Sequence, residues 1–283
     1  MTPAAKVGPT GRPLREFPVP APLAGHGPGR IIALCNQKGG VGKTTSTINL
    51  AAALAEYGRK VLCVDFDPQG ALSAGLGVTS IDVPTIYELL MGEVKVTANA
   101  IQHSGTPNVD VIPANIDLSA AEIHLVGEVA REHILATVLR QVANDYDVIL
   151  IDCQPSLGLL TVNALTASHG VLIPLECEFF ALRGVALLID TIEKVRERLN
   201  PAIVLDGILA TMYDARTLHA REVLERVVET FGDKVLDTAI TRTVKFPDAS
   251  VAGQPVTEFA PDHPSADQYR AVARELVARG AVA

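Results

Sequence analysis

Hydrophobic and amphipathic stretches alternate along this chain from about residue 30 onwards. The hydrophobic runs predict β-strands at residues 31–36, 60–66, 109–113, 147–153, 170–175, 203–212 and 235–240. The amphipathic stretches predict helices over about 43–57, 84–92, 118–143, 157–167, 180–199, 217–231 and 264–280. This alternation predicts an α/β fold with one doubly wound, mostly parallel sheet and helices on both faces. No repeat or break marks a second domain, so we expect a single domain over residues 30–283.

The first 29 residues follow no such pattern. They contain seven prolines and five glycines, and repeated proline prevents both a helix and pairing as a central strand. We therefore expect residues 1–29 to form a disordered extension. Its cations Lys6, Arg12 and Arg15 could contact DNA or a partner protein, although an inert tail is the simpler interpretation.

The composition predicts an aliphatic core. Of the 283 residues 48% are hydrophobic, only 4% are aromatic, and none is tryptophan. Ala, Val, Leu and Ile must therefore fill the interior, as in layered α/β folds with buried parallel strands. The net charge of −8 does not favour nucleic acid over the whole molecule, so any DNA contact needs a local basic patch.

Cysteine use and hydropathy indicate a cytoplasmic protein. The cysteines form no Cys-x-x-Cys pair, so we expect buried reduced thiols rather than disulfides or a metal cluster at Cys35, Cys63, Cys153 and Cys177. No uninterrupted apolar stretch reaches the ~18–20 residues of a membrane helix. The first residues also lack the apolar core of a secretion signal.

A candidate phosphate-binding loop lies between the first predicted strand and the first predicted helix. Residues 36–45 read Asn-Gln-Lys-Gly-Gly-Val-Gly-Lys-Thr-Thr. Glycines at 39, 40 and 42 let the backbone approach a phosphate and turn its N–H groups inward. Lys43 can bridge the β- and γ-phosphates, and Thr44 can place its hydroxyl on Mg²⁺. The start of the helix adds partial positive charge.

This loop departs from the usual pattern at its first position. The pattern G-x-x-x-x-G-K-[ST] begins with glycine, but Gln37 occupies that place. The next residue is a second lysine, Lys38. A second cation in a loop that is already cationic requires a reason.

Three acids follow two of the other predicted strands. Asp65 and Asp67 end the strand at 60–66, and Asp152 ends the hydrophobic run at 147–153. Ligands of an open parallel sheet bind beyond the carboxyl ends of its strands, so these acids should face the phosphate loop. They can bind Mg²⁺ or hold the attacking water. Taken alone, Asp67 could instead form an Asx turn before Pro68, and Asp152 could simply start a polar turn.

The segments Asn-Gln-Lys-Gly-Gly-Val-Gly-Lys-Thr-Thr, Val-Asp-Phe-Asp-Pro-Gln-Gly and Ile-Leu-Ile-Asp-Cys-Gln-Pro-Ser-Leu-Gly, which begin at residues 36, 64 and 149, resemble the ParA/Soj branch of the ParA/MinD ATPases. This family carries a deviant Walker A motif. The likeness extends from about residue 30 to the end of the chain and includes residues 211–217.

The resemblance implies a dimer. In this family two subunits sandwich two ATP molecules, and the extra lysine, here Lys38, reaches the partner's nucleotide and helps to neutralise the transition state. The family roles fall on Lys43 for phosphate, Thr45 for the α-phosphate and Asp67 for the hydrolytic water. Contacts to the nucleotide are implied for Lys38, Gly39, Gly40, Val41, Gly42, Lys43, Thr44, Thr45 and Met212. The Mg²⁺ environment is implied for Thr44, Asp65 and Asp152.

The resemblance also implies partners. Family members bind DNA nonspecifically as dimers and are stimulated by a ParB-like protein, so we expect a cytoplasmic, nucleoid-associated ATPase. Arg216, Arg242 and Lys245 match the basic DNA-contacting positions, and phosphate contacts of this kind need no base readout. A merely solvated surface is the alternative for these three cations.

Two segments depart from the family. Gln154 replaces the first proline of the common Asp-x-Pro-Pro-Ser loop, and residues 241–249 differ from the usual Pro-Arg-Asn-Val-Arg-Leu stretch. The second region resembles the adenine-contacting loop and part of the DNA surface. This departure therefore bears on adenine contact and DNA affinity, and it leaves the phosphate-binding motif untouched.

Three other functions are weighed against this one. A MinD-like membrane-cycling ATPase needs a basic amphipathic C-terminal helix, whereas residues 269–279 have an apolar face of mostly Ala and Val, so no stable membrane association is expected. A relative of the nitrogenase iron protein would hold an iron–sulfur cluster on cysteines of two subunits. A non-enzymatic binding module would lack the water-positioning acid, which Asp67 argues against.

Overall fold

The computed structural model describes residues 7–178 and 181–283, and in this part of the chain a single seven-stranded sheet organises the fold. The strand order is β3-β4-β2-β5-β1-β6-β7. All neighbouring strands pair in parallel except β3 and β4. The strands are β1 (Arg30–Leu34), β2 (Val61–Phe66), β3 (Gln102–His103), β4 (Val109–Ile112), β5 (Val148–Cys153), β6 (Gly170–Glu176) and β7 (Val204–Thr211).

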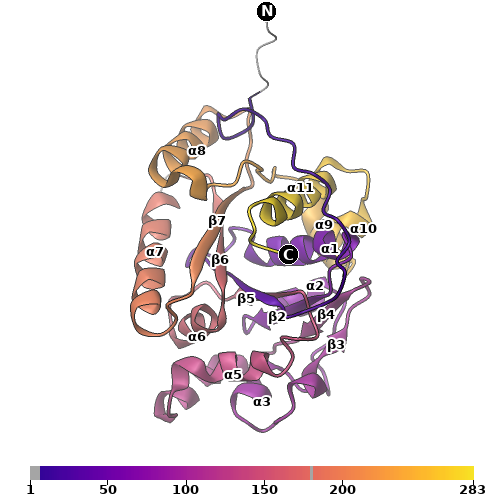
Figure 1. Ribbon diagram of the computed structural model, residues 1–283, viewed down its shortest axis with the longest axis vertical. Helices are drawn as coiled ribbons and strands as arrows, with labels where there is room; N and C mark the ends of the chain where they lie inside the picture. The colour runs from indigo at the N-terminus through magenta and orange to yellow at the C-terminus, as the bar shows by residue number, and fades with distance from the viewer. Residues whose placement is uncertain (1–6, 179–180) are drawn as a thin grey trace, which may run out of the picture.

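Helices cover both faces of this sheet (Figure 1). On one face lie α3 (Ile86–Leu90), α4 (Leu118–His124), α5 (Ile134–Arg140), α6 (Leu159–Ala167), α7 (Ala181–Arg198) and α8 (Leu218–Phe231). On the other lie α1 (Lys43–Glu56), α2 (Ala71–Gly75), α10 (Val256–Phe259) and α11 (Pro264–Ala278), with α9 (Lys245–Val251) beside α2 and α10. The predicted doubly wound, mostly parallel architecture is confirmed.

Two hydrophobic cores result from the alternation of side chains along each strand. In β1, Ile31 and Ala33 pack on the face covered by α5, α6 and α7, whereas Ile32 and Leu34 pack on the face covered by α1 and α11. Both faces are buried, which explains why the strands read as continuous apolar runs. Because β1 lies between β5 and β6, its carboxyl end opens at the centre of the sheet, where the phosphate loop follows.

The helix predicted over residues 118–143 is wrong in its length. It is divided into α4, a 3₁₀ turn at Leu125–Gly127, a second 3₁₀ turn at Arg131–His133, and α5. Ala130 between the two turns has φ 52°, a left-handed conformation that no helix continues through. Val126 and Val129 are largely exposed, so this stretch has no buried face to hold a continuous helix against the sheet.

The strand predicted at residues 235–240 is also wrong. This segment runs beside β7 and makes only isolated bridges, such as Ile208 to Val235. The backbone N–H groups of Asp237 and Thr238 donate hydrogen bonds to the buried carboxylate of Glu275 on α11, at 2.7 and 2.9 Å. Because these two N–H groups bond to a side chain, they are not available for the backbone hydrogen bonds that would pair the segment as a strand.

Short elements account for most of the remaining differences. The antiparallel β3, the helices α2, α9 and α10 and the 3₁₀ turns at Thr97–Ala100 and Gly232–Lys234 were not predicted. Of the helix predicted over 180–199, residue 180 lies outside the described residues, and α7 is described from Ala181. No helix in the described ranges is long and apolar enough to cross a membrane.

The Pro-rich segment lies against the domain over residues 7–29, while residues 1–6 lie outside the described part. Arg12 donates to the carbonyls of Val235 and Gly232 and to the carboxylate of Asp237. Farther along, Arg59 donates to the carbonyl of Ala21, and His26 pairs with Asp147 at 2.7 Å. The segment has no helix or extended strand, as its prolines predict, but its contacts describe a strap rather than a free tail.

We predict that Arg12→Ala releases the first part of this strap. The variant loses hydrogen bonds to two carbonyls and a charged pair, each worth about 0.5–3 kcal/mol. Amide hydrogen exchange over residues 8–17 should therefore accelerate. Arg15→Ala is the matched control, since Arg15 is 68% exposed and its Nε lies 3.8 Å from Asp237. Equally fast exchange in the wild type would instead support the disordered extension expected from the sequence.

Candidate active site

The phosphate loop leads from β1 directly into α1. Gly42 occupies the position before the helix with φ 83°, a left-handed conformation that favours glycine. No side chain caps the start of α1, so its first N–H groups are available to an anion. The loop is held by its neighbours: Asn36 donates to the carbonyl of Pro174 at 2.8 Å, and Thr211 donates to the carbonyl of Val41 at 2.8 Å.

Lys43 is the buried cation of this site. Only 7% of the residue is exposed, and its Nζ donates to the carbonyl of Lys38 at 3.2 Å. Burial lowers the pKa of Lys43, while the nearby carboxylates of Asp152 and Asp67 oppose that shift. The ammonium group therefore points back over the loop.

Asp152 and Thr44 meet at the carboxyl end of β5. The Thr44 hydroxyl donates to Asp152 at 2.7 Å, and the Thr47 hydroxyl donates to its other oxygen at 3.3 Å. Asp152 is 1% exposed. Burial, together with the negative charge of Asp65, raises its pKa to about 7. One buried lysine does not fully compensate for this carboxylate.

Asp65 lies on the adjacent strand, in register with Asp152. Its Oδ2 accepts from the N–H and the hydroxyl of Ser73 at 2.9 and 2.6 Å. Burial raises the pKa of Asp65 to about 6, although the Ser73 hydrogen bonds lower it. The structure thus places two buried carboxylates side by side on β2 and β5, with Asp65 bound to α2 rather than to Thr44.

The oxygen donors at this edge fit a magnesium ion. Mg²⁺ prefers hard oxygen ligands and is usually held by one or two carboxylates, phosphate oxygens and waters. Thr44 and Asp152 supply a hydroxyl and a carboxylate within hydrogen-bond distance. Among the described residues no group of three His, Cys, Asp or Glu side chains forms a metal site, so the ion would need further oxygens from phosphates and water.

Asp67 begins the turn that follows β2. Its carboxylate accepts the N–H of Gln69 at 3.0 Å, which is the Asx turn considered as the alternative. Its charge also acts on Lys43 and Asp152. The turn therefore fixes the side chain close to the buried cluster, and forming the turn does not remove Asp67 from the site.

A cavity of about 280 Å³ opens beside the phosphate loop. The predicted contacts Gly42, Thr45 and Met212 line it. Met212 has φ 51°, a strained conformation for a residue with a side chain. The remaining lining residues include Thr211 and five members of the segment 241–249, which resembles the adenine-contacting loop; those five are Thr241, Arg242, Thr243, Phe246 and Pro247. Ile240, Ser250 and Tyr269 also line the cavity, and sequence reasoning gave them no role in the site. The altered segment 241–249 therefore forms much of this wall.

Lys38 is turned toward carboxylates of its own chain. Its Nζ lies 3.0 Å from Glu176 and 2.5 Å from Glu178. Burial works against the charged form, but the hydrogen bonds to Glu178 and Glu176 raise the pKa of Lys38. The two acids were not singled out from the sequence, although both follow the predicted strand at 170–175.

Each of the three predicted DNA-contacting cations has a neighbouring side chain in its own chain. Tyr213 bridges to Thr241, which brings the segments around Arg216 and Arg242 together. Arg216 pairs with Asp214 at 2.8 Å, and Arg242 pairs with Glu176 at 2.9 Å. Lys245 on α9 lies 5.9 Å from the centre of the Phe259 ring. The basic surface that the sequence suggested is thus partly neutralised in this state.

Gln154 has a structural role in the loop after Asp152. Its side-chain amide donates to Oε1 of Glu122 in α4 at 3.1 Å, and this Glu122 oxygen also accepts the N–H of Leu160 at 3.4 Å. A proline at this position could not make the side-chain bond. The substitution therefore ties the loop at 153–158 to α4.

The described cysteines are all free and buried, as expected for reduced thiols. Cys35 and Cys153 face each other, with their Sγ atoms 3.0 Å apart, at the ends of β1 and β5. Burial raises the pKa of Cys153 well above its usual value. A buried thiol of this kind is not placed to share a cluster with a second subunit.

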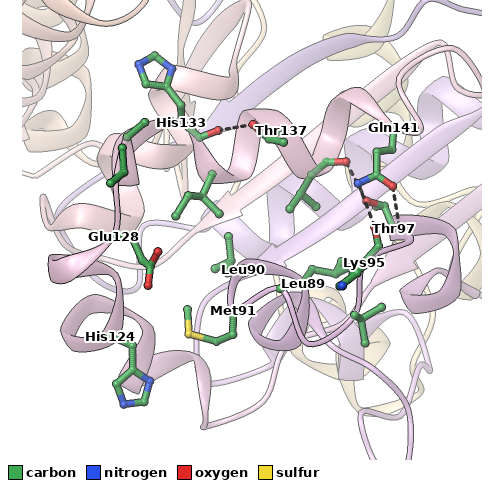
Figure 2. A pocket seen from close by; sticks show the side chains of 16 residues that line it. Leu89, Leu90, Met91, Lys95, Thr97, His124, Glu128, His133, Thr137 and Gln141 are labelled. Carbon is green, nitrogen blue, oxygen red and sulfur yellow. Dashed lines mark hydrogen bonds between the residues drawn. The ribbon is translucent and has the colours of Figure 1, made fainter.

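A separate groove of about 500 Å³ lies between α3 and α5 (Figure 2). Leu89, Leu90 and Val138 form apolar parts of its lining, and Lys95 and His133 are among its polar lining residues. No predicted site residue lines it. The chemistry that the sequence predicts is gathered instead at the carboxyl ends of β1, β2 and β5.

Known proteins resemble the chain along most of its length. A family model described as an AAA domain matches residues 29–205. An uncharacterised protein of Mycobacterium tuberculosis is 61% identical over 274 residues, which cover 96% of this chain and 86% of that protein. The chromosome-partitioning ATPase Soj of Treponema pallidum is 48% identical over 251 residues, 89% of this chain and 98% of Soj.

A solved structure is also similar to this chain in fold and in sequence. The crystal structure of cobyrinic acid a,c-diamide synthase from Mycobacterium smegmatis with bound ADP and magnesium superimposes with a TM-score of 0.78. The two proteins are 40% identical, and the match covers 89% of this chain and 96% of that one.

We predict that the stability of the nucleotide-free protein falls as pH rises through the pKa of Asp152. The folded-state pKa of about 7 lies above the ordinary value of 3.8, so the folded chain binds more protons than the unfolded chain between them. Stability is then lost as pH rises through this window. Thermal unfolding of wild type and Asp152→Asn between about pH 4 and pH 8 tests this. The variant should fall less steeply; parallel curves would contradict the assignment.

Proposed function

The chain belongs to the ParA/Soj family of partitioning ATPases, and we propose that it couples an ATP-dependent dimer to DNA segregation. It is an ATP-hydrolysing enzyme that uses ATP and Mg²⁺, as the Soj relatives and the related nucleotide-bound structures indicate. The observation that carries the site assignment is the contact of Thr44 with the buried Asp152, beside the buried Lys43, at the uncapped start of α1.

We assign the in-chain roles from this geometry. Lys43 would bind the β- and γ-phosphates, and Thr44 with Asp152 would hold Mg²⁺, which would supply positive charge to the transferred phosphoryl group. Asp67, fixed by its turn beside the cluster, orients the attacking water. The adjoining cavity lined by Met212 and Tyr269 takes the base. Asp65 supports the magnesium environment from β2.

The proposed dimer gives Lys38 its function. Within one chain Lys43 already serves the phosphate site, so a second lysine adds most if it acts on the nucleotide of a second copy. Cations placed on developing phosphate charge accelerate transfer. We therefore propose an ATP-sandwich homodimer whose two sites are each completed by Lys38 of the other subunit.

Dimer formation would in turn create the DNA-binding form. We propose that Arg216, Arg242 and Lys245 contact DNA phosphates without base specificity, which predicts strongly salt-dependent binding. A ParB-like protein would stimulate hydrolysis and return the protein to monomers. The cycle would take place in the cytoplasm, on the nucleoid, and would move a chromosome or a plasmid.

A MinD-like membrane cycle is the second candidate, and α11 argues against it. Ala266, Tyr269, Val272, Ala273 and Leu276 of this helix are buried against the sheet side of the fold. A helix that already buries its apolar face has little left to insert into a membrane interface. Robust ATP-dependent co-sedimentation with anionic liposomes would favour this candidate instead.

We predict that Lys43→Ala and Asp67→Ala both lose ATP turnover. Removing a phosphate-binding cation or a water-orienting acid should lower the rate by about a hundredfold or more. Phosphate release by the purified protein with Mg²⁺ and ATP measures this. Lys194→Ala, an exposed lysine of α7 paired with Asp190, is the matched control. Turnover like the wild type in both variants would refute the mechanism.

We predict a different loss for Lys38→Ala. Because Lys38 is proposed to act on the partner's nucleotide, the variant should still bind ATP but lose ATP-dependent dimerisation or hydrolysis. Nucleotide binding by fluorescence and oligomeric state by sedimentation velocity separate these two properties. Dimerisation and turnover that both stay unchanged would leave the loop as an ordinary phosphate cradle.

A further inference from the structure

Glu176, the last residue of β6, lies between two cations with different proposed roles. Its Oε2 accepts from Lys38 Nζ at 3.0 Å, and its Oε1 accepts from Arg242 at 2.9 Å. Each carboxylate oxygen therefore has its own cation. The Glu176 side chain is 12% exposed, whereas those of Lys38 and Arg242 are 42% and 65% exposed. The acid is thus the fixed member, and the two cations are free to leave it.

Lys38 has a second carboxylate partner. Glu178 accepts from its Nζ at 2.5 Å, and this lysine lowers the pKa of Glu178. The four groups Lys38, Arg242, Glu176 and Glu178 carry two positive and two negative charges. The cluster is therefore balanced as long as Lys38 stays within its own chain.

Two cavities adjoin this cluster, one beside Lys38 and one beside Arg242. Lys38 and Glu176 line a cavity of about 370 Å³ beside α7. Arg242 lines the cavity proposed for the base, together with its neighbours Thr241 and Thr243. One carboxylate thus connects the lysine of the phosphate loop with the wall of the base cavity.

We propose that Glu176 is a positioning residue that holds Lys38 inside its own chain and links its release to Arg242. This inference rests on the proposed function, because it concerns what Lys38 must give up to reach a second copy. When Lys38 leaves, Arg242 remains the only cation hydrogen-bonded to Glu176 in the described structure. Dimer formation and the position of Arg242 then become coupled, and such coupling acts in both directions.

The test is Glu176→Gln in the full chain. Glutamine keeps the shape but cannot hold either cation by charge. The ATP concentration for half-maximal dimerisation should fall about two- to fivefold, as expected for losing partly exposed ion pairs. Affinity for random-sequence duplex DNA at low salt should rise by a similar factor. Sedimentation velocity and fluorescence anisotropy measure the two effects.

Two matched variants separate the effect on Lys38 from the effect on DNA binding. Glu178→Gln removes only a partner of Lys38, so it should ease dimerisation and leave the DNA affinity of the monomer unchanged. Asp214→Asn frees the exposed Arg216 without touching Lys38, so it should leave the ATP dependence of dimerisation unchanged. If Glu176→Gln unfolds, Glu178→Gln still tests whether carboxylates restrain Lys38.

The outcomes are distinct. Dimerisation and DNA affinity that shift together in Glu176→Gln support the proposal. The proposal is overturned if Glu176→Gln, or Glu178→Gln measured in its place, needs as much ATP to dimerise as the wild type. It is also overturned if Glu176→Gln changes dimerisation but not DNA affinity. A wild-type protein that stays monomeric with ATP would instead contradict the proposed function. Measuring the wild type beside the variants therefore separates the failure of this inference from the failure of the proposed function.

Discussion

Buried charge at the carboxyl ends of β1, β2 and β5 is the constraint on which this site depends. Lys43, Asp65 and Asp152 are almost fully buried, so two carboxylates and one cation are shielded from water in this region. An ionised carboxylate without full compensation is costly there. The raised pKa values of Asp65 and Asp152 express that cost. A divalent cation bound beside these carboxylates would supply the positive charge that the chain lacks.

The surroundings follow from this arrangement. The uncapped start of α1 adds positive potential where phosphate would lie, and the cavity with Met212 and Tyr269 gives the rest of a nucleotide a place beside it. Lys38 is the one loop cation that faces away from this cluster, toward Glu176 and Glu178. In the monomer Lys38 is thus paired with carboxylates of its own chain and takes no part in the phosphate site. This fits a site that is proposed to be complete only in a dimer.

Sequence reasoning was sufficient where local pattern determines structure. The phosphate loop, the acids after β2 and β5 and the aliphatic strands follow from spacing and hydropathy, because a parallel sheet brings its strand ends together. It failed where tertiary contacts decide. Glu275 takes the N–H groups that would have made a strand of residues 235–240, and Glu176 lies 66 residues from the Arg242 that it pairs with. No local pattern indicates such partners.

The claim that each site needs Lys38 from the other subunit is tested most directly by mixing two inactive variants. Lys38→Ala retains its own Asp67, and Asp67→Ala retains its Lys38. In a mixed dimer, the nucleotide bound by the Lys38→Ala subunit then has both groups. Measured by ATP turnover, each variant should be inactive alone and the mixture should regain activity. A mixture that stays as inactive as its components would contradict the account.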